Sequence, residues 1–238
     1  MMKKILALLC VALLSHVCAD DLKIAVGAGY KKPVGEVLKA YEESGHEKID
    51  AMYGNMAQIF AQAKQTDISL VLADKKFLEK QKELTFVKYQ TIGTGIAVIA
   101  YAKGVNFDSI EDLTKESIKT IAMPEAKKAI YGDAGMELLN NAKLYERVKE
   151  KLLVVATVPQ VSSYVATHEV DVGIMNLTAA LDNIDKMGGY IKIPQAYYTP
   201  IEIVAGSLKT CETDTACQAF VAFLKTSKAK EIFTKYGL

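Results

Sequence analysis

Short apolar runs alternate with amphipathic stretches along almost the whole chain. Buried strands are predicted at residues 22–26, 49–53, 68–73 and 95–102. In the first amphipathic stretch, apolar residues recur at the spacing of a single helix face, which predicts a helix that opens near Pro33. These residues are Val34, Val37, Leu38 and Tyr41. This alternation predicts an α/β fold in which mostly parallel sheets carry helices on both faces.

The same alternation continues to the C-terminus. Further strands are predicted at 120–122, 152–156, 172–175, 191–193 and 201–205. Further helices are predicted at 56–64, 75–82, 129–142, 158–168 and 177–187, and a last helix after Cys217. Asp74 precedes the helix at 75–82 and is expected to cap it, because a carboxylate accepts hydrogen bonds from unpaired first-turn amides.

The N-terminal segment differs from the rest of the chain. Lys3 and Lys4 precede an unbroken apolar stretch at 5–14, which is shorter than the roughly 20 residues that cross a bilayer. Residues 17–19 then match the positions that a signal peptidase reads. We therefore expect a signal peptide at 1–19 and a soluble protein in the periplasm of a Gram-negative cell. The alternative of a lipoprotein anchored at Cys18 fits poorly, since Val17 stands where a small residue is required.

Composition and charge exclude some classes of protein. Half of the residues are apolar and 24% are charged, as in an ordinary globular protein. Without residues 1–19, 27 Lys+Arg face 28 Asp+Glu, which gives a formal charge of −1. Nucleic-acid-binding proteins usually carry a clear basic excess, so nucleic acid is not an expected partner.

Candidate chemistry is sparse. Cys211 and Cys217 are the only cysteines after the leader, and an even pair in an exported chain predicts a disulfide. Their spacing is not CxxC, and only His46 and His168 remain as imidazoles, so we expect no metal site. GxSxG, GxGxxG and Walker A motifs are missing, and the carboxylates are scattered. We therefore predict that the protein is not an enzyme and needs no cofactor.

Several loops that contain glycine or asparagine run directly into predicted helices. They lie at 27–33, 53–57, 124–132, 157–160 and 176–178. Helix N-termini present unpaired N–H groups and a partial positive charge. Several of them that converge on one cleft would form an anion site without a fixed cation.

A set of collinear motifs resembles one family. The exported leader, the strand at 22–26 with its glycine turn, and ISLVLAD at 68–74 resemble the periplasmic molybdate-binding proteins of ABC transporters. Pro124-Glu125 followed by AIYG at 129–132, EVDVGI at 169–174 and AKEIFTKYGL at 229–238 resemble them too. The resemblance covers residues 21–238 in order.

This resemblance implies a fold and a function. It implies the two-lobed, type 2 periplasmic binding protein fold, with crossovers near 96–101 and 200–204. Lobe 1 would combine 20–98 with 203–238, and lobe 2 would comprise 99–202. A small oxyanion, molybdate or tungstate, would be held between the lobes by neutral hydrogen-bond donors. The monomeric protein would close around it and dock on an ABC permease, whose ATPase drives import.

The resemblance also implies ligand contacts, by position. They are Gly29, Tyr30, Asn55, Ala129, Tyr131, Val158 and Asn176. Gly29 and Asn55 stand where the family usually has serine, and Asn176 stands where it has tyrosine. Either the amides replace the lost hydroxyl donors or the ligand is different. Alternatively, Asn55 and Asn176 only cap helices, and Tyr131 only packs.

Lys31 is a further candidate contact. At the cleft it would favour a phosphorylated or carboxylated ligand through charge-assisted hydrogen bonds, whereas Lys31 and Lys32 would otherwise project into solvent. Two other functions therefore stay open. One is a binding protein for a phosphate ester, a different oxyanion or an organic acid. The other is an exported surface protein without a role in transport.

Overall fold

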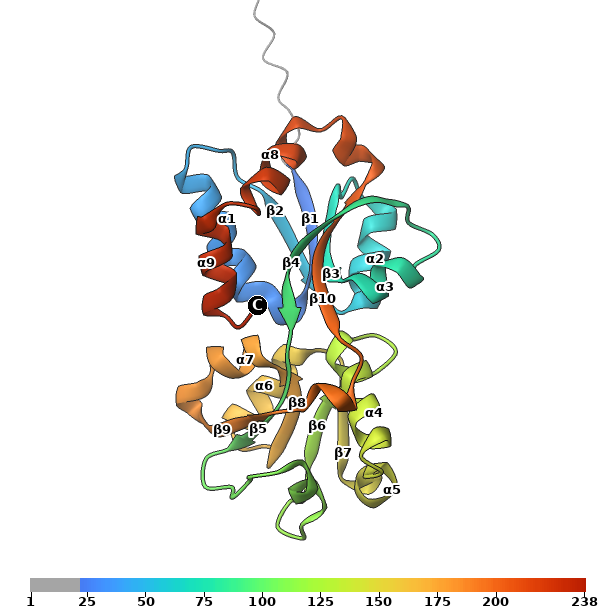
Figure 1. Cartoon of the computed structure of the whole chain (residues 1–238), viewed down its shortest axis with the longest axis vertical. Coiled ribbons are helices and arrows are strands. Elements are labelled where there is room, and N and C mark those ends of the chain that lie inside the picture. Colours follow the sequence, from blue (N-terminus) through green and yellow to red (C-terminus); the bar gives the residue numbers. More distant parts are fainter. Residues whose placement is uncertain (1–21) are drawn as a thin grey trace, which may run out of the picture.

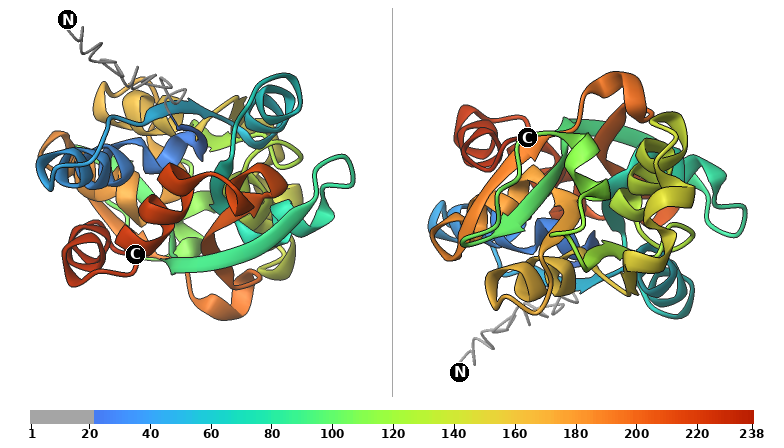
Figure 2. Two further views of the ribbon diagram at one scale, coloured as in Figure 1. Left: turned by 90° about the horizontal axis from the view of Figure 1, so that it is seen from above. Right: turned by 90° about the horizontal axis from the view of Figure 1, so that it is seen from below.

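The protein consists of two lobes stacked along its long axis (Figure 1). The computed structural model describes residues 22–238, so the expected signal peptide lies outside the described residues. Each lobe is built on a five-stranded sheet with helices on both sides (Figure 2). The two-lobed α/β fold expected from the sequence is therefore confirmed.

The lobe drawn at the top of Figure 1 has the strand order β2-β1-β3-β10-β4. Its strands are β1 (Lys23–Gly27), β2 (Asp50–Gly54), β3 (Leu70–Asp74), β4 (Phe86–Gly95) and β10 (Ile201–Leu208). Its helices are α1 (Lys31–Glu43), α2 (Met56–Gln65), α3 (Lys75–Lys80), α8 (Thr215–Phe223) and α9 (Ser227–Lys235). In Figure 1, α1 and α9 flank the sheet on the left, and α2 and α3 flank it on the right.

The lower lobe has the strand order β7-β6-β8-β5-β9. Its strands are β5 (Ala97–Ala102), β6 (Ile121–Pro124), β7 (Leu152–Val155), β8 (Val172–Asn176) and β9 (Met187–Lys192). Its helices are α4 (Ile130–Asn141), α5 (Tyr145–Val148), α6 (Val158–Ala166) and α7 (Leu177–Asp182). The central strands β5 and β8 are almost fully buried, which explains their continuous apolar sequence.

Both sheets are mixed, but in each of them four strands run in the same direction and one runs the opposite way, so the expectation of mostly parallel sheets is confirmed. β1 is parallel to β2 and β3, but β10 is antiparallel to β3 and β4. In the lower lobe β6 is parallel to β7 and β8, but β5 is antiparallel to β8 and β9. The physical reason is that β5 and β10 each enter their sheet from the other lobe and run away from the interface.

The chain passes between the two sheets at two neighbouring places. Only Ile96 separates β4 from β5, and the segment 193–200 separates β9 from β10. The two passages lie side by side, because Gly95 at the end of β4 pairs with Ile201 at the start of β10.

The remaining strands all end at the interface between the lobes. Gly27, Gly54 and Asp74 end strands of the upper lobe there, and Pro124 and Asn176 end strands of the lower lobe. A helix begins shortly after each of these ends, so the N-termini of helices from both lobes converge on the interface. The fold therefore produces the arrangement of helix ends that the loop pattern predicts.

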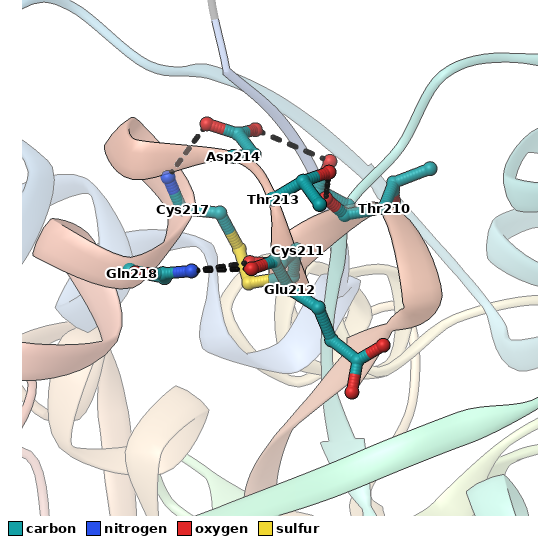
Figure 3. The surroundings of a disulfide bond; sticks show 8 residues. Thr210, Cys211, Glu212, Thr213, Asp214, Cys217 and Gln218 are labelled. Atoms are coloured by element: carbon teal, nitrogen blue, oxygen red, sulfur yellow. Dashed lines mark hydrogen bonds between the residues drawn. A yellow bond between two sulfur atoms is a disulfide. The ribbon is translucent and has the colours of Figure 1, made fainter.

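The predicted disulfide between Cys211 and Cys217 is confirmed. It lies beside the start of α8, at the end of the upper lobe that faces away from the interface (Figures 1 and 3). Asp214 caps α8 by accepting a hydrogen bond from the Cys217 amide at 3.1 Å, and the Gln218 side chain donates to the Glu212 carbonyl at 2.6 Å. The disulfide and these two hydrogen bonds together fix the short segment from Cys211 to Gln218.

Candidate functional site

A small cavity lies between the lobes, where the helix N-termini meet. Its volume is about 30 Å³. Since a single water molecule needs about 10–15 Å³, the cavity has room for a group of a few atoms. From the upper lobe it is lined by Gly27, Ala28, Gly29, Tyr30, Gly54, Asn55 and Met56. From the lower lobe it is lined by Ala129, Ile130, Tyr131, Thr157 and Val158, and no lining side chain is charged.

Three helices begin at the wall of this cavity: α2, α4 and α6. Asn55 caps α2 and Thr157 caps α6, each through a capping box with a glutamine three residues later. No side chain caps α4, which follows Ala129 directly. The amides of Ile130 and Tyr131 therefore have no partner within the helix, and they supply N–H groups at the cavity wall.

Two tyrosines from different lobes meet at the cavity. The hydroxyl oxygens of Tyr30 and Tyr131 lie 2.7 Å apart, and each side chain is 2% exposed. Burial is the main cause that raises the pKa of both phenols far above the ordinary value. Both tyrosines therefore stay neutral hydrogen-bond donors at physiological pH.

Asn176 is fully buried and does not line the cavity. Its side-chain NH₂ group donates to the Gly29 carbonyl of the other lobe at 3.0 Å, and its carbonyl oxygen accepts from the Ala179 amide at 3.1 Å. The second bond makes Asn176 the N-cap of α7. A Cβ atom at position 29 would lie 3.0 Å from the Asn176 amide nitrogen. Gly29 and Asn176, the two positions at which the resemblance leads us to expect a departure from the family pattern, are therefore in contact.

Asn55 has two roles in the structure. It caps α2 by accepting from the Gln58 amide at 3.0 Å, and its NH₂ group donates to the Ala156 carbonyl of the other lobe at 3.4 Å. Unlike Asn176, Asn55 lines the cavity. Asn55 thus caps α2 and also lines the cavity.

The two lysines at the start of α1 do not line the cavity. The Lys31 ammonium lies 5.7 Å from the centre of the Tyr53 ring. Lys32 forms an ion pair with Asp182 across the lobe interface. The structure therefore brings six of the eight predicted residues to the cavity and leaves Lys31 and Asn176 outside its lining.

The cavity has neighbours that the predicted contacts do not include. Asp74, which caps α3 as expected by accepting from the Lys76 amide, is 3% exposed, and burial raises its pKa to about 6. The Lys76 ammonium crosses the interface to Asp133 at 2.8 Å and Glu137 at 3.0 Å. No pattern along the chain announces this ion-pair cluster, because its members are far apart in sequence. Thr157, by contrast, lies in a loop that the pattern singles out.

The described part of the chain shows neither a metal cluster nor a membrane-spanning helix. Between residues 22 and 238, no group of three or more His, Cys, Asp or Glu side chains is placed to hold a metal ion. No helix within the same residues has the length and apolar content needed to cross a membrane.

Comparison with known proteins agrees with this geometry. Residues 22–238 match the family described as bacterial extracellular solute-binding protein. The molybdate-binding protein ModA of Rhodobacter capsulatus is 28% identical over 226 residues, which cover 92% of this chain and 88% of that protein. The resemblance to molybdate-binding proteins seen in the sequence is therefore confirmed.

Solved structures share the fold. The periplasmic molybdate-binding protein of Azotobacter vinelandii superposes with a TM-score of 0.82 at 21% identity, over 91% of this chain and 98% of that one. PEB3 with bound L-phospholactate superposes with a TM-score of 0.73 at 19% identity, over 91% of this chain and 98% of that one. The matched family model covers all of the described residues, and the chain belongs to the bacterial extracellular solute-binding protein family.

Proposed function

We propose that the protein captures a small, fully deprotonated oxyanion between its lobes and delivers it to an ABC importer. Molybdate and tungstate are the first candidates, because the relatives with the same overall sequence pattern include a molybdate-binding protein. The observation that carries this proposal is the uncharged cavity at which α2, α4 and α6 begin.

The chemistry of the cavity favours an anion that only accepts hydrogen bonds. The unpaired amides of α4 and the neutral phenols of Tyr30 and Tyr131 are donors, and the helix ends add a partial positive charge. The wall contains no lysine or arginine, so it offers no cation that could form an ion pair with a singly charged carboxylate. The small volume also favours a compact inorganic ion over a ligand with a carbon skeleton.

The rest of the proposal follows from the family. The protein would act in the periplasm as a monomer after removal of residues 1–19. Its partners would be a permease and an ATPase of the inner membrane. Its role would be binding and not catalysis, since no lining residue offers a nucleophile paired with a base.

Calorimetric titration tests the proposal. The protein is expressed with its own leader, purified from the periplasm of a Gram-negative host and stripped of bound ligand. Molybdate, tungstate, sulfate and phosphate are titrated separately, with L-phospholactate as an organic phosphate. We expect tight binding of molybdate and tungstate alone. Binding of phospholactate in their place would redirect the proposal to an organic anion, and failure to bind any of the five would reject it.

A further inference from the structure

The segment that follows α9 lies where the two lobes meet (Figure 1). It ends the AKEIFTKYGL motif at 229–238, to which the proposed oxyanion site assigns no role. The chain turns back at the end of α9, because the Leu238 amide donates to the Phe233 carbonyl at 3.1 Å. Gly237 makes this turn possible with a φ of +76°, which glycine adopts without strain. We call residues 236–238 the C-terminal strap.

The C-terminal strap is attached to the upper lobe by polar contacts with α1. Tyr236 is buried, and its hydroxyl donates to the Glu36 carboxylate. The Lys235 ammonium, at the end of α9, donates to the same carboxylate at 3.1 Å. The strap therefore belongs to the upper lobe and moves with α1 and α9.

The C-terminal strap also contacts α7 of the lower lobe. The Thr178 hydroxyl donates to the Tyr236 carbonyl at 3.0 Å, and both residues are buried. A Cβ atom at Gly237 would stand 2.6 Å from the Leu177 side chain and 3.6 Å from that of Leu181. The strap thus lies directly on these two leucines, and one polar and one apolar contact join it to the other lobe.

A third contact is made with the strand that leads into the lower lobe. A Cβ atom at Gly93 on β4 would stand 2.7 Å from the Leu238 backbone, so Leu238 covers this glycine. Gly93 lies three positions before Ile96, the single residue between β4 and β5. The strap therefore extends from the crossover between the lobes to α7. None of its residues lines the cavity, so its contacts act on the lobes and not on a ligand.

We propose that the C-terminal strap holds the two lobes together and determines how readily they separate. Separation would break the Thr178 hydrogen bond and expose the leucines of α7 that the strap covers. The strap would stay on the upper lobe, because its contacts with Glu36 lie within that lobe. This inference goes beyond the proposed function and holds for any ligand of the cavity.

Hydrogen exchange of the Met56 amide measures separation of the lobes without a ligand. This amide begins α2 and donates to the Lys128 carbonyl of the other lobe at 2.8 Å, so it exchanges when the lobes part. Thr178→Val removes only the hydroxyl and is expected to speed Met56 exchange about fivefold, measured by NMR on protein purified from the periplasm. The Ile59 amide donates to the Asn55 carbonyl within α2 at 3.0 Å and is expected to keep its rate.

Gly93→Ala tests the strap from its other end. The methyl group would displace Leu238, whereas the backbone at 93 is not left-handed and accepts alanine. We expect Met56 exchange to rise about as much as in Thr178→Val. The double variant is expected to exchange within about twofold of the faster single variant, because both changes release the same strap.

Thr167→Val is the matched control. The Thr167 hydroxyl also donates to a backbone carbonyl, that of Ser163 at 3.0 Å, but both residues lie in the lower lobe at the end of α6. This variant is expected to leave Met56 exchange unchanged. Met56 exchange at the wild-type rate in Thr178→Val and Gly93→Ala would overturn the strap, and so would effects that add in the double variant. Equal acceleration of Met56 and Ile59 would show general loosening of α2 and would contradict it too.

Release of bound molybdate separates this inference from the proposed function. Since the cavity lies between the lobes, molybdate is expected to dissociate about fivefold faster from Thr178→Val and Gly93→Ala than from the wild type. Release at the wild-type rate would contradict the strap and leave the proposed function standing. A wild-type protein that binds no oxyanion would reject the proposed function, and Met56 exchange alone would then decide whether the strap holds the lobes.

Discussion

Gly29 shows how a single missing side chain changes the chemistry of the cavity. The resemblance to molybdate-binding proteins implies a serine at this position, whose hydroxyl would be a donor. In this protein the space is taken by Asn176, whose amide lies 3.0 Å from the point where a Cβ would stand. Glycine at 29 thus allows a hydrogen bond between the lobes, from the Asn176 side-chain amide to the Gly29 carbonyl.

Substitution of Gly29 by alanine is expected to weaken oxyanion binding. The methyl group would push the Asn176 amide away from the Gly29 carbonyl, at a cost of roughly 1 kcal/mol or about a fivefold loss of affinity. Calorimetric titration measures the loss. Gly35→Ala is the matched control, because a Cβ there meets nothing within 4 Å and the position lies inside α1. The control is expected to keep its affinity and to raise the free energy of unfolding by about 0.5–1 kcal/mol. Equal affinities of the two variants would contradict the role of Gly29.

Asp74 makes the stability of the protein depend on pH in an unusual direction. Burial raises its pKa from 3.8 to about 6. Between these two values the folded state holds a proton that the unfolded state has released, so the contribution of Asp74 to stability grows as the pH falls. At neutral pH the buried charge therefore costs up to about 3 kcal/mol.

The variant Asp74→Asn tests this dependence. Asparagine keeps the cap of α3 but cannot ionise, so the variant is expected to be more stable than the wild type at about pH 7.5. This advantage is expected to shrink as the pH falls through about 6 and to disappear below about pH 3, where Asp74 is neutral in both the folded and the unfolded state. Urea unfolding at a series of pH values measures the difference. An advantage that is independent of pH would show that the charge is not its cause.

At the scale of elements, the disulfide acts on one turn of α8 and not on the site. Cys211 and Cys217 are six positions apart, so the closed loop is short and the bridge is expected to stabilise the fold by about 2 kcal/mol. Helix α8, which contains Cys217, lies at the end of the lobe remote from the lobe interface (Figure 1). Replacement of both cysteines by serine is therefore expected to lower the urea midpoint and leave oxyanion affinity unchanged. A loss of affinity in the folded variant would contradict this separation.

The sequence predicts best those helices and strands in which apolar residues recur at one clear spacing. The helix predicted at 129–142 is found as α4 (Ile130–Asn141), and the strand predicted at 172–175 is found as β8 (Val172–Asn176). The helix predicted at 177–187 ends at Asp182, because β9 already begins at Met187. The predicted last helix is two helices, since Thr226 caps a new one by accepting from the Ala229 amide.

The longest strand, β4 (Phe86–Gly95), is missing from the predicted elements. It lies at the edge of its sheet with a bulged register against β10, and its residues are mostly half-buried or exposed. Such a strand has neither a continuous apolar run nor a clean alternation, so periodicity does not reveal it.

The site could be predicted as a set of loops but not as a set of contacts. The loops at 27–33, 53–57, 124–132 and 157–160 all contribute to the cavity, because parallel strands end together at one edge. The position of Asn176 in sequence does not show whether its amide faces the ligand or Gly29. That choice depends on how closely the two lobes approach, which is a property of the tertiary structure.

At the scale of the whole molecule, hydrogen bonds and ion pairs between the two lobes hold the lobes together around the cavity. The Met56 amide donates to the Lys128 carbonyl at 2.8 Å, and the Thr178 hydroxyl donates to the Tyr236 carbonyl at 3.0 Å. The ion pairs of Lys76 with Asp133 and Glu137 add a charged contact at which all three side chains are about one-third exposed or less. If the two lobes come together when the ligand binds, the free energy of these contacts between the lobes contributes to the measured ligand affinity.

Removal of the Lys76 charge is expected to favour separation of the lobes. Lys76→Met would leave Asp133 and Glu137 without their cation, at a cost of about 1 kcal/mol or a fivefold loss of oxyanion affinity. The loss is expected to shrink at high salt, where the wild-type ion pairs are screened. Lys75→Met is the matched control, because the neighbouring Lys75 pairs with Glu202 inside the upper lobe at 3.3 Å. Calorimetry in low and high salt measures both variants, and equal losses would contradict a role for the interface.

The position of β10 has a consequence for the order in which the protein can fold. β10 is the last strand in sequence, yet it lies between β3 and β4, and Asp74 pairs with Ile203 across more than a hundred residues. The lower sheet consists of consecutive strands and can form from contacts within 97–192. The upper sheet has to wait for a long loop to close, which is a slow step. During synthesis or export from the N-terminus, the first segment to emerge is thus among the last to complete its sheet.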